Sequence, residues 1–236
     1  MTDRFTPAFT PDCTRRETVF GWIYLLLHIF ALPLLLALVQ LYLMPDMTDV
    51  LANTLYYCTS LSIVMIVFWK LLRREFDHLM DRPFRCISGL FTGYFIWYVF
   101  SLALTGLLQT FGFEMSSPND EVIDFMAQRS YNVILTISVI AAPLLEEVLF
   151  RGIAFQSLRK KSRLLAYVVS MTLFCIYHVW QFAIIYQDAT FLLYGIQYLP
   201  VTFAITWSYE YSGSLWTPIL FHMSNNWLAM MIQQTM

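Results

Sequence analysis

Long apolar stretches recur along the chain, separated by short polar segments. A helix that crosses a lipid bilayer needs about 20 consecutive, mainly apolar residues. Seven stretches meet this requirement: residues 18–43, 51–72, 87–111, 131–150 and beyond, 163–185, 190–209 and 213–233. Residues 186–189 alone separate the fifth from the sixth, which predicts a tight turn there. The pattern predicts an all-α fold, a polytopic transmembrane helical bundle of about seven spans.

The composition agrees with a chain that is surrounded by membrane lipid. Hydrophobic residues make up 58% of the sequence and charged residues only 13%. Soluble domains carry about 25% charged residues, and a water-soluble fold of this size could not bury so much apolar surface. The net charge of -2 and the lack of a basic tract outside the loops argue against a nucleic-acid partner.

Charged residues between the apolar stretches alternate in sign from one connection to the next. Because basic loops stay in the cytoplasm, the N-terminus is expected there, in a multi-pass protein of the cytoplasmic membrane. The basic connections hold Arg4, Arg15, Arg16, Lys70, Arg73, Arg74, Arg82, Arg85, Arg159, Lys160, Lys161 and Arg163. The acidic connections hold Asp46, Asp49, Glu114, Asp120, Glu121, Asp124 and Asp188, with Arg129 among them.

No repeat, low-complexity tract or long linker divides the chain, which predicts a single membrane domain. Within it, residues 1–112 form an N-terminal region with three spans, and residues 113–236 form a core with four. The first apolar stretch is too long for the hydrophobic part of a cleaved signal peptide, so we expect a retained span. The four cysteines lack any paired spacing and are expected to be reduced thiols.

Ionisable side chains inside apolar spans are energetically expensive, so they mark candidate sites. Glu146 and Glu147 are adjacent carboxylates in the fourth stretch. Arg151 follows Glu147 by four residues, so the two share a helix face and can form an ion pair that braces the site. Glu146 points about 100° away from that face. The ion pair predicts a structural role for Glu147 and Arg151 and leaves Glu146 without a partner.

His178, His222 and Asn226 are polar side chains in the later stretches. A helical rise of about 1.5 Å per residue puts Glu146 roughly 20 Å and His178 roughly 22 Å from the basic connection between their stretches. The same rise puts His222 roughly 14 Å and Asn226 roughly 20 Å from the start of the last stretch, on one helix face. Each residue alone could serve a helix–helix hydrogen bond. Together they predict a polar cluster built by three helices.

These residues form a motif set that resembles that of the CPBP family, which groups CAAX prenyl endopeptidases with bacteriocin-processing and immunity membrane proteins. The resemblance covers about residues 116–226 and implies cleavage of a peptide bond within or at the edge of the membrane. The small size is typical of bacterial members, for which a prenylated substrate is not expected. The motifs are Glu146-Glu147-xxx-Arg151, Phe174-xxx-His178 and His222-xxx-Asn226, with the run from Gly213 to His222.

Peptide hydrolysis needs an activated water, a site for the developing oxyanion and a proton for the leaving amine. We assign Glu146 to water activation, with His178 sharing the proton. We assign His222 and Asn226 to the oxyanion, as the resemblance also implies. The expected substrate is a membrane-associated peptide or protein, and no cofactor is expected.

Three alternatives stay open at this point. A non-hydrolytic immunity or peptide-binding protein would use the same cavity without a base. A zinc-dependent peptidase would hold the metal with Glu146, His178 and His222, although no HExxH motif is present. A secondary transporter could use these side chains for proton coupling, but the sequence shows no inverted repeat.

Overall fold

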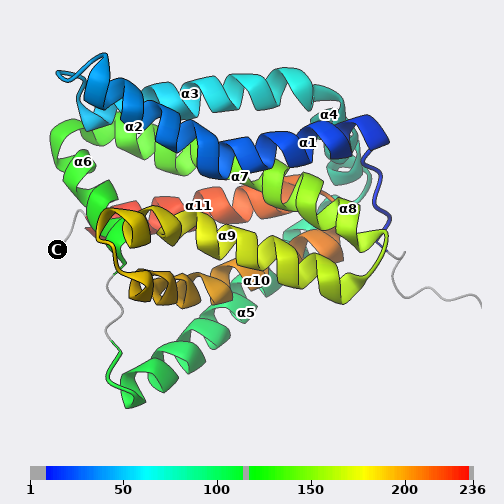
Figure 1. Ribbon diagram of the computed structural model, residues 1–236. Coiled ribbons are helices and arrows are strands. Elements are labelled where there is room, and N and C mark those ends of the chain that lie inside the picture. Colours follow the sequence, from blue (N-terminus) through cyan, green and yellow to red (C-terminus); the bar gives the residue numbers. More distant parts are fainter. Residues whose placement is uncertain (1–8, 114–116, 234–236) are drawn as a thin grey trace, which may run out of the picture.

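The computed structural model describes residues 9–113 and 117–233, which form helices and the short segments that connect them (Figure 1). The helices lie side by side, and most of the connections gather at the two ends of the assembly. This arrangement confirms the all-α helical bundle. Arg4 and Glu114, which belong to the charge pattern, lie outside the described residues.

The first half of the chain forms five α-helices. A π-helical turn, Leu27–Ala31, joins the first two into one continuous rod. The rod begins at a capping box, in which the Thr14 hydroxyl accepts from the Glu17 N–H and the Glu17 carboxylate accepts from the Thr14 N–H. The helices are α1 (Arg15–Leu26), α2 (Leu32–Tyr42), α3 (Asp49–Val67), α4 (Trp69–Asp81) and α5 (Pro83–Thr110).

The second half forms a long rod and three further α-helices. Two π-helical segments, Ile137–Ala141 and Val148–Phe155, join α6, α7 and α8 into one long rod over Pro118–Arg159, which is kinked at Ser130. A turn at Gln187 precedes a 3₁₀ segment, Ala189–Tyr198, as the tight-turn prediction requires. The helices are α6 (Pro118–Thr136), α7 (Ala142–Glu147), α8 (Gln156–Arg159), α9 (Arg163–Ile185), α10 (Leu199–Ser212) and α11 (Trp216–Gln233).

Within the described residues, 6 helices are long and apolar enough to cross a membrane. The seventh predicted span corresponds to α11, which is 18 residues long and packs inside the bundle. Its polar residues, His222 and Asn226 among them, keep it below the hydropathy of a span. The six are Arg15–Tyr42, Asp49–Val67, Pro83–Thr110, Pro118–Arg159, Arg163–Ile185 and Ala189–Ser212.

Two predicted boundaries are wrong. The second stretch does not continue to residue 72, because the helix breaks at Phe68 and α4 follows as a separate amphipathic helix. Leu71 and Leu72 of α4 face the core, and the basic residues beside them face outward. The fourth stretch starts earlier than residue 131, since α6 begins at Pro118 and continues past a kink at Ser130. The acidic segment around Asp120 is therefore helical.

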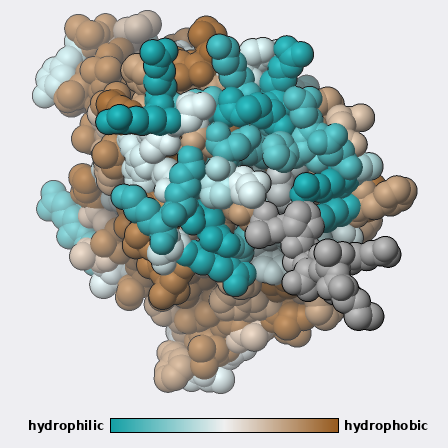
Figure 2. All heavy atoms as spheres, turned by 90° about the vertical axis from the view of Figure 1, so that its right-hand side faces the viewer, coloured by the Kyte–Doolittle hydropathy of each residue, from teal (hydrophilic) through white to brown (hydrophobic). Residues whose placement is uncertain are grey.

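One end of the bundle gathers most of the basic residues, and we call it the basic end. Figure 2 looks onto this end and shows hydrophilic side chains spread over it. The opposite end, which we call the acidic end, is formed by the α2–α3 and α9–α10 connections and the start of α6. The basic end holds Arg15, Arg16, Lys70, Arg73, Arg74, Arg82, Arg85, Arg159, Lys160, Lys161 and Arg163.

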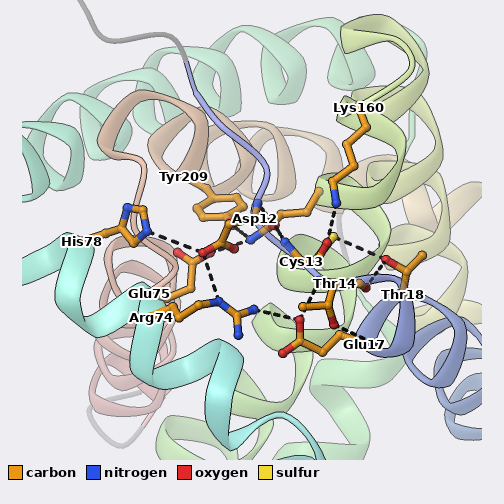
Figure 3. A network of polar contacts seen from close by, with 11 residues as sticks. Asp12, Cys13, Thr14, Glu17, Thr18, Arg74, Glu75, His78, Lys160 and Tyr209 are labelled. Carbon is orange, nitrogen blue, oxygen red and sulfur yellow. Dashed lines mark hydrogen bonds and ion pairs between the residues drawn. The ribbon is translucent and has the colours of Figure 1, made fainter.

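A polar network ties the N-terminal segment to the basic end (Figure 3). The side-chain oxygen of Gln156 accepts from the N–H groups of Asp12 and Cys13, at 3.0 and 2.9 Å. The Gln156 amide nitrogen donates to Glu75 and Tyr209, and the Tyr209 hydroxyl donates to Glu75 Oε1 at 2.9 Å. The network thus joins the N-terminal segment, α4, α8 and α10 across the end of the bundle.

Candidate active site

Four of the predicted polar residues line one cavity of about 690 Å³ inside the bundle: Glu146, His178, His222 and Asn226. They come from α7, α9 and α11, so the predicted convergence of three helices is confirmed. The long rod ends at Arg159, and Glu146 is buried inside the bundle. The predicted depth of Glu146 was counted from this same end of the rod.

Glu147 and Arg151 form a buried ion pair behind the cavity wall, with 3.0 Å between Arg151 Nη1 and Glu147 Oε1. Both side chains are 0% exposed. Arg151 also donates to the Thr202 hydroxyl at 2.6 Å and to the Thr206 hydroxyl at 3.3 Å, and it lies over the Phe174 ring. A buried charge needs such full pairing, because each unpaired ion in the interior costs several kcal/mol.

His222 connects this ion pair to the cavity. Its Nδ1 lies 2.8 Å from Glu147 Oε1, and since a carboxylate oxygen accepts, Nδ1 carries the hydrogen. The other ring nitrogen, Nε2, then faces Glu146 at 4.0 Å from Oε2. Glu147 thereby fixes both the orientation and the tautomer of the ring, a contact that the sequence did not predict.

His178 is oriented in the same way by its own helix. Its Nδ1 donates to the Phe174 carbonyl at 2.9 Å, which leaves Nε2 directed at Glu146 Oε2 at 3.9 Å. The Phe174 and Tyr198 rings pack on the imidazole, with centroids 4.5 and 4.4 Å away. The two histidine Nε2 atoms are thus almost equally far from one carboxylate oxygen.

Glu146 is 3% exposed, and its Oε2 has no hydrogen-bond partner within the described residues. Separations of 3.9 and 4.0 Å to the two Nε2 atoms are too long for direct hydrogen bonds. They are suited to one water molecule that bridges the carboxylate and a ring nitrogen. A carboxylate and imidazole nitrogens around one water are the groups needed for general-base catalysis.

Asn226 is held at the cavity wall by the carbonyl of Ser138, which its Nδ2 contacts at 2.8 Å. This carbonyl belongs to the π-helical turn before α7, in which the Ala142 N–H donates to the Ile137 carbonyl. The next residue, Pro143, has no N–H, so the next carbonyl of that ladder, Ser138, receives no hydrogen bond from it. Pro143 therefore supplies an acceptor for Asn226 as well as a local distortion.

Sequence reasoning missed the residues that hold the site from behind. Thr202 and Thr206 of α10 bind Arg151, and their spacing of four residues places them on one helix face. That spacing in an apolar helix was a usable signal. The contacts of Ser138 and of the Phe174 carbonyl could not have been found, because backbone acceptors leave no trace in the sequence.

The comparison with protein families points to this segment of the chain. Residues 128–228, which include all six predicted site residues, match the family model described as Type II CAAX prenyl endopeptidase Rce1-like. No curated protein and no solved structure matches the chain. The match confirms the resemblance to the CPBP family. The apolar helices of the described residues are those of a multi-pass membrane protein.

Proposed function

We propose that this protein is an intramembrane endopeptidase that hydrolyses a peptide bond of a membrane-associated peptide or protein without a metal. The observation that carries the proposal is the position of Glu146 Oε2, buried, without a hydrogen-bond partner and about 4 Å from two histidine nitrogens. The family match over the same residues supports it.

In the proposed reaction, a water molecule gives a proton to Glu146, and its oxygen bonds to the carbonyl carbon of the substrate. His178 Nε2 shares that proton with Glu146. As the C–N bond breaks, the proton passes to the nitrogen of the leaving amine, so the products are a carboxylic acid and an amine, and Glu146 is a carboxylate again.

The oxyanion needs hydrogen-bond donors that point into the cavity. Asn226 Nδ2 uses one of its two hydrogens on Ser138 and has the second available. His222 is held by the Glu147 carboxylate at Nδ1, which directs Nε2 into the cavity, and Nε2 can donate there when it carries a hydrogen. Glu147 and Arg151 act as a brace and do not line the cavity.

A zinc-dependent peptidase would use Glu146, His178 and His222 as ligands. Ligand atoms of a tetrahedral zinc site with bonds of about 2.0–2.2 Å lie roughly 3.3 Å apart. Glu146 Oε2 is 3.9 and 4.0 Å from the histidine nitrogens. No group of three His, Cys, Asp or Glu side chains in the described part of the chain is arranged to hold a metal ion. The geometry favours the metal-independent reaction.

The test uses the purified protein in lipid vesicles with a library of membrane-anchored peptides, with and without a chelator. The wild type should cleave in both conditions. Glu146→Gln should lower the rate by about 10²–10⁴-fold, the usual contribution of a general base. The matched variant Glu147→Gln, one residue away, should lower stability, because it breaks the pair with Arg151. It should lower the rate less than Glu146→Gln does, because it disturbs only the orientation of His222.

Other outcomes assign other functions. Cleavage that is lost with the chelator and restored by zinc would support the metal-dependent peptidase. Bound peptides that are never cleaved by the wild type would support a peptide-binding or immunity protein. Equal cleavage by the wild type and Glu146→Gln would contradict the assignment of the base.

A further inference from the structure

The site is closed toward the basic end of the bundle. Between Glu147 and Gln156, the long rod is fully buried. Gly152 lies in this layer, and a Cβ there would come within 3.2 Å of Leu215 and 3.3 Å of Leu71. The polar network of Gln156, the last residue of this buried segment, continues the layer toward the basic end. An apolar layer and a polar network therefore separate the cavity from this end.

The same cavity extends to the acidic end. Its lining continues from Glu146 to Gln40, Asp49, Ser117 and Asp120, which lie at the ends of α2, α3 and α6. Among the described residues, no lysine or arginine lines the cavity, and no residue of the basic end does. A peptide that reaches Glu146 without rearrangement of the bundle therefore enters from the acidic end.

The acidic end is the side opposite the basic connections. It holds six acidic residues among those described, Asp46, Asp49, Asp120, Glu121, Asp124 and Asp188, and one basic residue, Arg129. Since basic connections stay in the cytoplasm, the acidic end faces away from it. Asp49 and Asp120 place carboxylates in the mouth of the cavity itself. A mouth with one sign of charge raises the local concentration of ligands of the opposite sign.

We infer that the site takes peptides from the non-cytoplasmic side of the membrane, and that these peptides carry a positive charge next to the segment that enters the cavity. The inference rests on the proposed peptidase function. It names the side of entry and the charge class of the substrate. The unpartnered Glu146 Oε2 directed into the cavity, the closed basic end and the carboxylates of the mouth support it together.

The structure also gives the spacing of this charge. Tyr57 lines the cavity and lies close enough to Glu146 for the two groups to interact electrostatically. Asp49 precedes Tyr57 by eight residues in α3, which is about 12 Å along the helix. An extended peptide covers this length with about four residues. The positive side chain is therefore expected about four residues from the cleaved bond.

The side of entry is tested by labelling of single cysteines in spheroplasts with a membrane-impermeant maleimide. Cys58, the exposed native cysteine, is first replaced in a Cys58→Ala parent. Asn53→Cys reports the cavity, one turn inside Asp49, and Lys161→Cys reports the basic end. Asn53→Cys should be labelled in intact spheroplasts, and Lys161→Cys only after lysis. Any other pattern overturns the inference, and none of this labelling depends on hydrolysis.

The charge preference is tested with quenched fluorescent peptides that have a randomised centre and either two lysines or two glutamates as a flank. The wild type should cleave the lysine-flanked set about tenfold faster, and salt should reduce this preference. Asp49→Asn with Asp120→Asn should reduce the preference at least about threefold. The matched control Asp124→Asn lies one turn further along α6, does not line the cavity and should keep the preference.

Failure of the inference and failure of the peptidase proposal give different results. Equal cleavage of both peptide sets overturns the charge preference and keeps the peptidase. If neither set is cleaved, binding is measured in place of the cleavage rate, as the protection of Asn53→Cys from maleimide labelling by added peptide. Protection by lysine-flanked peptides at concentrations where glutamate-flanked peptides give none then supports the inference, and equal protection overturns it.

Discussion

At the scale of single residues, the site depends on side chains whose polar atoms are fixed by one specific partner. Asn226 is the simplest case, because its amide donates to the Ser138 carbonyl. Asn226→Ala should lower kcat by about 10²–10³-fold, as expected for removal of an oxyanion donor, with a smaller change in KM. Steady-state cleavage of a peptide that the wild type accepts measures both. Asn225→Ala, the neighbouring residue that also lines the cavity, is the control. An equal loss in both variants would argue against the role of Asn226.

Arg151 gives a prediction about stability. Its guanidinium is paired with Glu147 and bound to Thr202 and Thr206, so Arg151→Met would leave a buried carboxylate without its countercharge. We expect a loss of about 3–5 kcal/mol in the free energy of unfolding. Thermal unfolding in detergent measures this loss. Arg129→Met, which removes only a contact over the Phe125 ring, should change the unfolding temperature little. Similar unfolding temperatures for the two variants would refute the brace.

The sequence could predict only part of this set. The Glu147–Arg151 pair follows from a spacing of four residues within one helix, so it needs no knowledge of the fold. The hydrogen bond from His222 to Glu147 joins residues 75 positions apart and depends on the rotation of α11 against α7. Depth along a helix follows from counting residues, but rotation about its axis is set by packing of the whole bundle.

At the scale of elements, the π-helical turn before α7 is coupled to the site through Pro143. Pro143→Ala would supply an N–H that can bond to the Ser138 carbonyl and compete with Asn226. We expect the rate of cleavage to fall about tenfold to hundredfold, because small displacements of catalytic groups have effects of this size. Stability should be unchanged or slightly higher, which thermal unfolding checks.

Pro200→Ala is the matched control for this variant. Pro200 lies in the first turn of α10, where a missing N–H is tolerated. Its replacement should leave the rate of cleavage within about twofold of the wild type. If both proline variants lose activity equally, the coupling between the π-helical turn and Asn226 is wrong.

Hydropathy predicted the elements better than it predicted their ends. Six of the seven predicted stretches have enough apolar residues to cross a membrane, and α11 is the exception because it carries His222 and Asn226. The break at Phe68 was not predictable from hydropathy, since Leu71 and Leu72 continue the apolar pattern. The two leucines belong to the buried face of the amphipathic helix α4. The same apolar residue type therefore occurs at the end of a span and in the amphipathic helix that follows it.

At the scale of the whole molecule, the bundle combines an open end with a closed one. The cavity that holds Glu146 reaches the acidic end, and the network around Glu75 and Gln156 lies at the basic end. Because this network joins the N-terminal segment to three helices, its integrity should govern the global stability of the protein. Glu75 is the buried carboxylate of this network, at 2% exposure.

Burial, with Asp12 nearby, raises the pKa of Glu75 from 4.5 to about 8, although its hydrogen bonds with Leu215, Tyr209 and Gln156 lower it in part. The folded protein then keeps a proton that the unfolded chain releases between these pH values. Stability should therefore fall as pH rises from 4.5 toward 8, by at most about 1.4 kcal/mol per pH unit.

Thermal unfolding at several pH values across this range tests the effect in the wild type and in Glu75→Gln, which cannot titrate. The difference in unfolding temperature, variant minus wild type, should increase steadily with pH, whatever constant offset the substitution adds. Asp77→Asn, an exposed position two residues further along α4, should show no such slope. A difference that is independent of pH for Glu75→Gln would mean that Glu75 is ionised throughout, held by the three groups that donate to it. The basic end would then be closed by a buried carboxylate, and mild alkaline pH would not loosen it.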